Sequence, residues 1–189
     1  MLVARRLHAS PAIRGWTTGA GNLRDRPEQQ STFMPLNPTD VVIETDRPTF
    51  RWRALEGALH YIVTIYDAKL RLVGSSGPVD STEWTTPNSL ERGVTYSWQI
   101  SALKDGETVV SPKPPLPQAR FRILDQHAVT VLAKLIRSAG RSHLALGVFY
   151  WKHGLIDESE RELQALANAN PSSTLAVELL KSVRALRRR

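Results

Sequence analysis

The sequence of 189 residues predicts an all-β sandwich followed by a small C-terminal α-helical bundle. Two patterns carry this prediction. Residues 34–124 are short segments of alternating apolar and polar residues separated by turn residues, which is typical of strands in an antiparallel sandwich. From residue 125 to residue 189 the apolar residues recur every three or four positions, which indicates amphipathic helices.

Residues 1–33 precede both patterns and show neither period. They contain five arginines against two acidic residues and are rich in Gly, Thr, Gln and Pro, so we expect a mostly disordered basic leader or linker. The apolar run "MLVA" ends at Arg5 and is too short for a secretory signal. An organellar transit peptide is the alternative because the first acidic residue is Asp25, although serine is sparse.

Some seven strands are expected in the second region, with no helical pattern between them. They are residues 41–45, 48–53, 59–67, 71–76, 82–86, 94–103 and 119–124. "KDG" at 104–106 indicates a turn. The proline-rich run 111–117 should form an extended edge or a loop, because proline has no N–H to donate to a neighbouring strand.

Parts of this region resemble a fibronectin type III or related immunoglobulin-like domain. The resemblance rests on "PTFRW", on "ALHYIVTIYD" and most specifically on Leu90, Gly93 and Tyr96. It implies that the tyrosine hydroxyl bonds back to the backbone at a corner of the sandwich, and that Trp52 is buried in an early strand. Trp98 shares the parity of Tyr96 and is expected in the core.

Four helices are expected after the strands. Val129, Leu132 and Ile136 define the apolar face of the first, which should end near Gly140. The second should run from about residue 142 to 152 and stop near Gly154.

Asp157 and Glu160 form a capping signature for the third helix, which Pro171 should end. Leu175, Leu179 and Val183, with Leu186, define the apolar face of the fourth.

The middle pair of helices resembles one tetratricopeptide repeat, a unit of about 34 residues. The matching residues are Leu146, Gly147, Tyr150, Gly154, Leu163 and Pro171. The resemblance implies that Gly147 allows a close approach of the neighbouring helix and that Leu163 fills a large apolar position. His143, Ser159 and Leu166 depart from the usual pattern. Because one repeat cannot bury its own apolar face, the flanking helices or the sandwich must cover it.

We expect no catalytic, metal or cofactor site. The absence of cysteine excludes disulfides and thiolate ligands, and no motif for a hydrolase or a phosphate-binding loop occurs. His143 and His153 would lie about 15 Å apart on one helix and cannot share a metal within it. The acidic residues between 157 and 162 are explained by the favourable field at a helix N-terminus.

The net charge of +7 does not indicate nucleic-acid binding, because the charge lies at the ends of the chain. The leader and the tail Arg187–Arg189 supply most of it, which leaves about +1 for residues 34–186. No run approaches the roughly 18 apolar residues that would span a membrane.

Tetratricopeptide repeats often bind peptides on the concave face of their first helices. The corresponding residues here are Arg141, Leu144, Val148, Trp151 and Lys152. A tryptophan beside a lysine is a suitable anchor for an acidic or C-terminal peptide. The alternative is that Trp151 packs on the preceding helix or on the sandwich.

A sandwich followed by such helices resembles bacterial envelope proteins, some of which carry an anti-sigma type regulatory domain and a transmembrane helix that this chain lacks. The resemblance implies a non-enzymatic protein-interaction or scaffold module in the periplasm or cell envelope, whereas the lack of a signal peptide favours the cytoplasm. One alternative is a structural or carbohydrate-contacting envelope appendage that uses Trp84, which we expect to be partly exposed. A less favoured alternative is association with nucleic acid through the basic termini.

Overall fold

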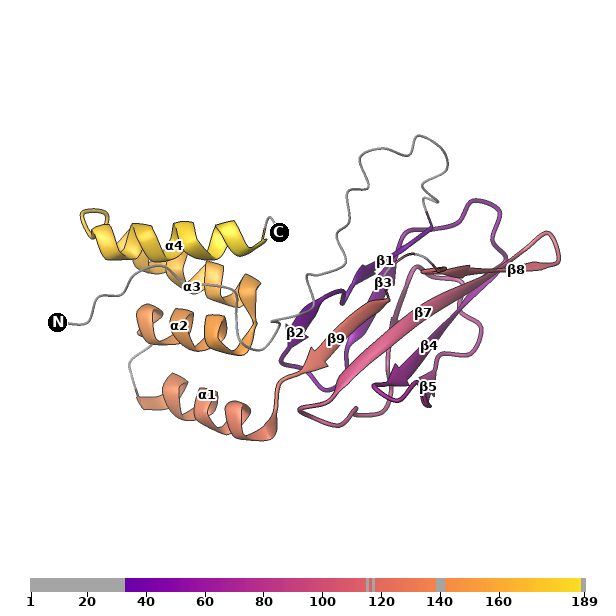
Figure 1. Ribbon diagram of the computed structural model, residues 1–189, viewed down its shortest axis with the longest axis horizontal. Helices are drawn as coiled ribbons and strands as arrows, with labels where there is room; N and C mark the ends of the chain where they lie inside the picture. Colours follow the sequence, from indigo (N-terminus) through magenta and orange to yellow (C-terminus); the bar gives the residue numbers. More distant parts are fainter. Residues whose placement is uncertain (1–32, 115, 117, 139–141, 188–189) are drawn as a thin grey trace. The chain divides into compact units, whose positions relative to one another are not determined.

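The computed structural model describes residues 33–114, 116, 118–138 and 142–187. The described residues form two compact units that meet in sequence between Ile123 and Leu124 (Figure 1). We call them the β unit and the helical unit. The expected leader, apart from its last residue, lies outside the described part of the chain, as do Gly140 and Arg141.

The described part of the β unit contains nine strands in two sheets. The strands are β1 (Pro35–Asn37), β2 (Val41–Ile43), β3 (Thr49–Trp52), β4 (His60–Asp67), β5 (Leu72–Ser75), β6 (Glu83–Thr85), β7 (Thr95–Lys104), β8 (Glu107–Ser111) and β9 (Ala119–Ile123). One sheet has the order β1-β3-β6, and the other has the order β2-β9-β7-β4-β5, with β8 paired to β7. The expected sheet and helix architecture is therefore present.

Two expectations about the strands were wrong. The sequence analysis missed β1 and β8, which are short and begin beside a turn or a proline. It also expected only antiparallel pairing, whereas β2 pairs with β9 in parallel, with Val41 opposite Phe121. The partner of a three-residue strand is set by contacts with distant residues, so its direction cannot be read from local alternation.

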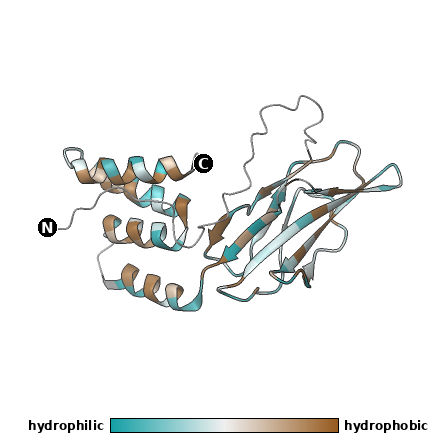
Figure 2. Cartoon of the chain, in the orientation of Figure 1, coloured by the Kyte–Doolittle hydropathy of each residue, from teal (hydrophilic) through white to brown (hydrophobic). Residues whose placement is uncertain are grey.

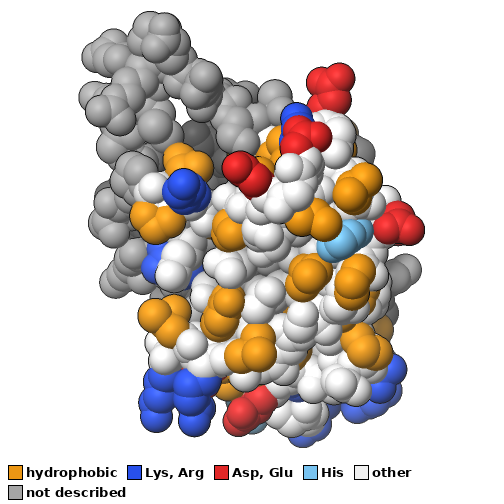
Figure 3. Space-filling view, turned by 90° about the vertical axis from the view of Figure 1, so that its right-hand side faces the viewer, with side chains coloured by type: hydrophobic (Ala, Val, Ile, Leu, Met, Phe, Trp, Pro, Cys, Tyr) orange, Lys and Arg blue, Asp and Glu red, His pale blue; other side chains and the backbone are white. Residues whose placement is uncertain are grey.

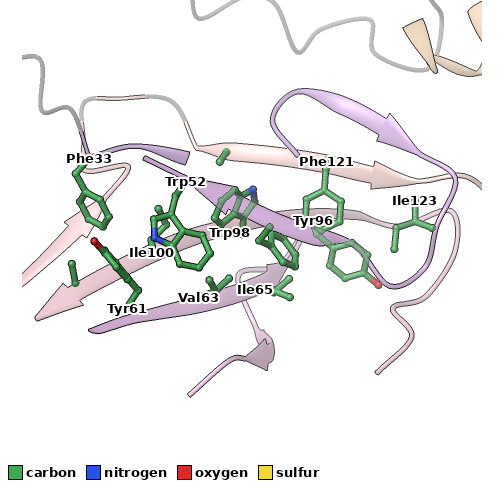
Figure 4. Packing of buried hydrophobic residues seen from close by; sticks show 13 residues of the cluster. Phe33, Trp52, Tyr61, Val63, Ile65, Tyr96, Trp98, Ile100, Phe121 and Ile123 are labelled. Carbon is green, nitrogen blue, oxygen red and sulfur yellow. The ribbon is translucent and has the colours of Figure 1, made fainter. Parts of the chain in front are cut away.

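One hydrophobic core lies between the two sheets (Figure 4). Phe50 from β3 makes edge contacts with Trp98 of β7 and Phe121 of β9, at ring-centroid distances of 4.9 and 5.6 Å. Aromatic pairs in this arrangement add to the free energy gained from burial alone. Trp52 and Trp98 are both buried, as expected.

The corner expected from Leu90, Gly93 and Tyr96 has the expected hydrogen bond. The Tyr96 hydroxyl donates to the carbonyl oxygen of Glu91 at 3.2 Å. Gly93 has φ +77°, a conformation that glycine adopts without strain, and its N–H donates to Ile123 O at 3.0 Å. The segment before β7 is thereby fixed to the end of β9.

Phe33 corrects the expected boundary of the leader. We placed it in the disordered segment, but its side chain is buried in the core and its ring lies 5.9 Å from that of Tyr61. Its carbonyl oxygen also accepts a hydrogen bond from Ser111 Oγ at 2.9 Å. The β unit therefore includes Phe33.

The described part of the helical unit contains α1 (Gln126–Ser138), α2 (His143–His153), α3 (Ile156–Ala169) and α4 (Thr174–Arg187). Each helix carries both apolar and polar stretches (Figure 2). Helix α2 ends at Gly154 with φ +82°, as predicted. None of the helices in the described part of the chain is long and apolar enough to cross a bilayer.

The start of α3 differs from the prediction. Asp157 was expected to cap this helix, but Leu155 occupies the cap position and no side chain makes a cap hydrogen bond. Leu155 is 1% exposed and its N–H donates to Tyr150 O, so burial and the tight Gly154 turn set the helix start. Asp157 and Glu158 lie in the first turn, where their charge is favoured.

Two residues assigned to apolar faces are exposed. Ile136 of α1 is 46% exposed and Leu175 of α4 is 39% exposed. Ile136 lies two residues before the end of α1, and Leu175 is the second residue of α4. The buried face of α4 consists of Ala176, Leu179, Leu180 and Val183.

Candidate functional site

The α2–α3 hairpin is closely packed at Gly147. A Cβ atom built on this residue would lie 2.7 Å from Leu163 Cδ2, which is shorter than any normal contact. Ser159 Oγ donates to Gly147 O at 2.8 Å from a fully buried position. Gly147 therefore permits the close approach of α3, as the sequence pattern indicated. This contact fixes which side of α2 is turned away from α3.

Three of the five expected site residues form an exposed stripe on α2. Leu144 and Val148 are 38% and 36% exposed, and Lys152 is also exposed. Their spacing of four residues places them along one face of the helix. We call Leu144, Val148 and Lys152 the α2 stripe. Arg141, another of the five expected site residues, lies outside the described residues.

Trp151 is not part of the stripe's open surface. It is half-buried and packs against the cluster formed by Leu163 of α3 and Leu179, Leu180 and Val183 of α4. The partners expected for Trp151 were a peptide or, as the alternative, the preceding helix or the sandwich. The cluster that it packs against comes from the two helices that follow α2.

Charged pairs hold the helices together beside the stripe. His143 Nδ1 lies 2.7 Å from Glu162 Oε2 and joins α2 to α3. Arg184 Nε donates to Glu160 Oε1 at 2.9 Å and joins α4 to α3. These acidic side chains are thus engaged within the unit. Lys152 supplies a positive charge at one end of the stripe, in the last turn of α2.

The described histidines lie in separate surroundings. The described residues contain no group of three or more His, Cys, Asp or Glu side chains that could hold a metal ion. His153 instead lies on the ring of Phe149, with a centroid distance of 4.3 Å. Burial lowers the pKa of His153, and Lys152 and His127 lower it further, while Asp125 acts in the opposite direction.

The lowered pKa of His153 predicts a loss of stability in mild acid. The unfolded chain binds this proton with a pKa of about 6.5, above the folded value, so stability is lost as the pH falls from 6.5 through the folded pKa. The variant His153→Phe keeps a ring on Phe149 without a titrating group. Chemical denaturation at pH 7.5 and pH 5 should therefore show a smaller loss for His153→Phe than for the unsubstituted protein. An equal loss in both proteins would contradict the prediction.

Trp84, the expected carbohydrate contact, is half-buried and belongs partly to the core. Its ring stacks on Phe50 at a centroid distance of 5.7 Å, and the two residues face each other across β3 and β6. The expectation of partial exposure is confirmed. A ring with one face already stacked has less surface to offer a sugar.

The six-stranded sheet also carries a cleft of about 260 Å³ that was not predicted from the sequence. It lies between the outer side of β4 and β7 and the proline-rich segment before β9. Its lining residues come from four separate parts of the chain, so no local motif marks them. In the sequence, the cleft was indicated only by the proline-rich run 111–117 and by the uncharged residues at the outward positions of β7.

Comparison with other proteins does not assign a family. No family model matches the chain, and no curated protein matches it in sequence.

Proposed function

We propose that this chain is a non-enzymatic protein-interaction module whose α2 stripe binds a peptide segment of a partner. The observation that carries the proposal is the exposure of two aliphatic side chains in register with a lysine, on a helix that is held against α3 by the close contact of Gly147 with Leu163. A rigid helix that presents apolar anchors beside one charge is a common recognition surface. A scaffold role in a bacterial cell envelope, suggested by the sequence resemblance, belongs to the same proposal.

The finer fold assignments are part of this proposal. The β unit is a sandwich of the fibronectin type III kind, supported by the Tyr96 hydrogen bond to Glu91 O. The α2–α3 hairpin is of the tetratricopeptide kind, supported by the Gly147–Leu163 contact and by the Gly154 turn. The α2 stripe then lies on the helix that such repeats use for binding.

The chemistry of the stripe defines the partner. Leu144 and Val148 favour an apolar side chain, and Lys152 favours a carboxylate at one end, either an acidic side chain or a chain terminus. We propose a short peptide that combines these two features. Trp151 contributes indirectly, because its packing against α3 and α4 holds α2 in place.

The test is selection of peptides from a displayed library on the full chain, followed by measurement of affinity with single synthetic peptides. The double variant Leu144→Glu and Val148→Glu should weaken binding at least about tenfold, a loss of about 1.4 kcal/mol. Lys152→Glu should weaken only those peptides that carry the carboxylate. The control Leu175→Glu adds a charge at an equally exposed leucine of α4 and should retain affinity.

Two outcomes would contradict the proposal. One is a peptide affinity that is unchanged in the double variant. The other is an equal loss in Leu175→Glu, which would indicate a general effect of negative charge. Circular dichroism of each variant checks that the helices remain folded.

A further inference from the structure

Among the described residues, those that line the cleft on the six-stranded sheet carry no charge. Its polar side chains are Tyr66, Ser97, Gln99 and Gln118. Its apolar lining residues are Leu70, Trp98, Pro112, Pro114 and Leu116. Charged residues make up 23% of the chain, so a cleft on its surface that contains none is a distinctive feature. On the face shown in Figure 3, charged side chains lie mainly toward the margins, and apolar and neutral surface occupies the middle.

The polar groups come from neighbouring positions of two paired strands. Tyr66 of β4 lies opposite Ser97 of β7, and Gln99 follows two residues later on the same side of β7. Gln99 Nε2 donates to Tyr66 Oη at 3.1 Å. This bond fixes the tyrosine ring and leaves Gln99 its carbonyl oxygen and a second N–H for a ligand.

Leu70 is placed unusually for a residue in a turn. It is 64% exposed and has φ +60°, a left-handed conformation that is unfavourable for leucine. Its side chain nevertheless lines the cleft. An apolar residue at this position adds an apolar wall opposite the amide and hydroxyl groups.

The lining selects against charged ligands. A phosphate, a carboxylate or an ammonium group placed here would lose water without gaining an opposite charge, which is unfavourable. A purely apolar ligand would leave the amides and hydroxyls without partners. A neutral molecule with both C–H faces and hydroxyl groups satisfies both sides of the cleft, and saccharides have this composition. The volume lies just below the range of about 300–1,000 Å³ for drug-sized ligands, so one or two sugar rings fit.

We propose that this cleft binds a neutral saccharide, with Gln99 and Gln118 hydrogen-bonding its hydroxyl groups and the Tyr66 and proline rings contacting its C–H faces. The site is separate from Trp84 and does not depend on the α2 stripe. The saccharide proposal and the peptide proposal can therefore fail independently.

The test is a nuclear magnetic resonance titration of the full isotope-labelled chain with maltotriose, cellotriose and chitotriose. At least one should cause saturable shifts centred on Tyr66, Ser97 and Gln99. Gln99→Ala and Tyr66→Ala should each lower the affinity at least about tenfold. Thr64→Ala and Ser101→Ala change the same sheet face outside the cleft and should leave the affinity unchanged.

Four outcomes would overturn the proposal. The first is that none of the neutral trisaccharides causes shifts in the cleft. The second is that a trimer of a hexuronic acid binds as tightly as the neutral probes, since the lining offers no cation for its carboxylates. The third is that a proline-rich peptide occupies the cleft and the saccharides do not. The fourth is that the saccharide-induced shifts disappear in Trp84→Ala and persist in Gln99→Ala. This result would place the sugar site at Trp84 and not in the cleft.

Discussion

Replacement of Trp98 by alanine should destabilise the β unit by about 3–5 kcal/mol, the largest effect we expect of any single substitution. The side chain is 1% exposed and contacts Phe50 of the opposite sheet, so its loss leaves a cavity between the two sheets. The indole N–H also donates to Pro38 O at 2.7 Å, and its removal leaves that buried hydrogen bond unmade. Chemical denaturation of the purified chain measures the effect.

Two further tryptophan variants sharpen this prediction. Trp98→Phe retains an aromatic ring without the N–H donor and should cost less than alanine. Trp84→Ala removes a half-buried ring that stacks on Phe50 and should also cost less, because part of that ring is already in water. A cost for Trp84→Ala equal to that for Trp98→Ala would contradict the assignment of Trp98 to the centre of the core.

Replacement of Gly147 by alanine should destabilise the helical unit by about 1–3 kcal/mol, although alanine is the better helix former. The added methyl group would lie within 3 Å of two side-chain atoms of Leu163, a residue with no exposed surface. The leucine cannot move into solvent, so α2 and α3 must separate or the side chain must leave its preferred rotamer. Thermal unfolding followed by the helical circular dichroism signal measures this effect, and we expect a lower midpoint temperature for Gly147→Ala.

A double-mutant cycle separates this contact from other effects of the substitution. Leu163→Ala alone should cost about 2–5 kcal/mol because it leaves a cavity. In that background Gly147→Ala should be neutral or stabilising, because the clashing atoms are gone and the helix propensity gain of about 1 kcal/mol remains. Additive costs of the two substitutions would show that Gly147 is not limited by Leu163.

Most local features of the fold could be predicted from the sequence. The long alternating strands β4 and β7 have a period set by their own residues, so their buried positions were predictable. The helix end at Gly154 was predictable for the same reason, since only the local backbone conformation is involved. The Tyr96 hydrogen bond spans only five residues.

The remaining features depend on residues distant in sequence. The parallel pairing of β2 with β9 and the burial of Phe33 against Tyr61 are of this kind. The packing of Trp151 is another example, because the cluster that it packs against comes from α3 and α4, and the helix period alone does not say which neighbour covers a given face. Three of the five expected site residues were therefore correctly predicted as exposed, whereas Trp151 was not.

The pairing of β2 with β9 has a consequence for the order in which the chain folds. It joins Val41, near the beginning of the β unit, to Phe121 near its end. Contacts between such distant residues form slowly, and during synthesis this pair cannot form until Ile123 has left the ribosome. The helices pack mainly against their neighbours in sequence, so they can fold through local contacts. We expect the helical unit to refold faster than the β unit, although it is synthesised after the β unit.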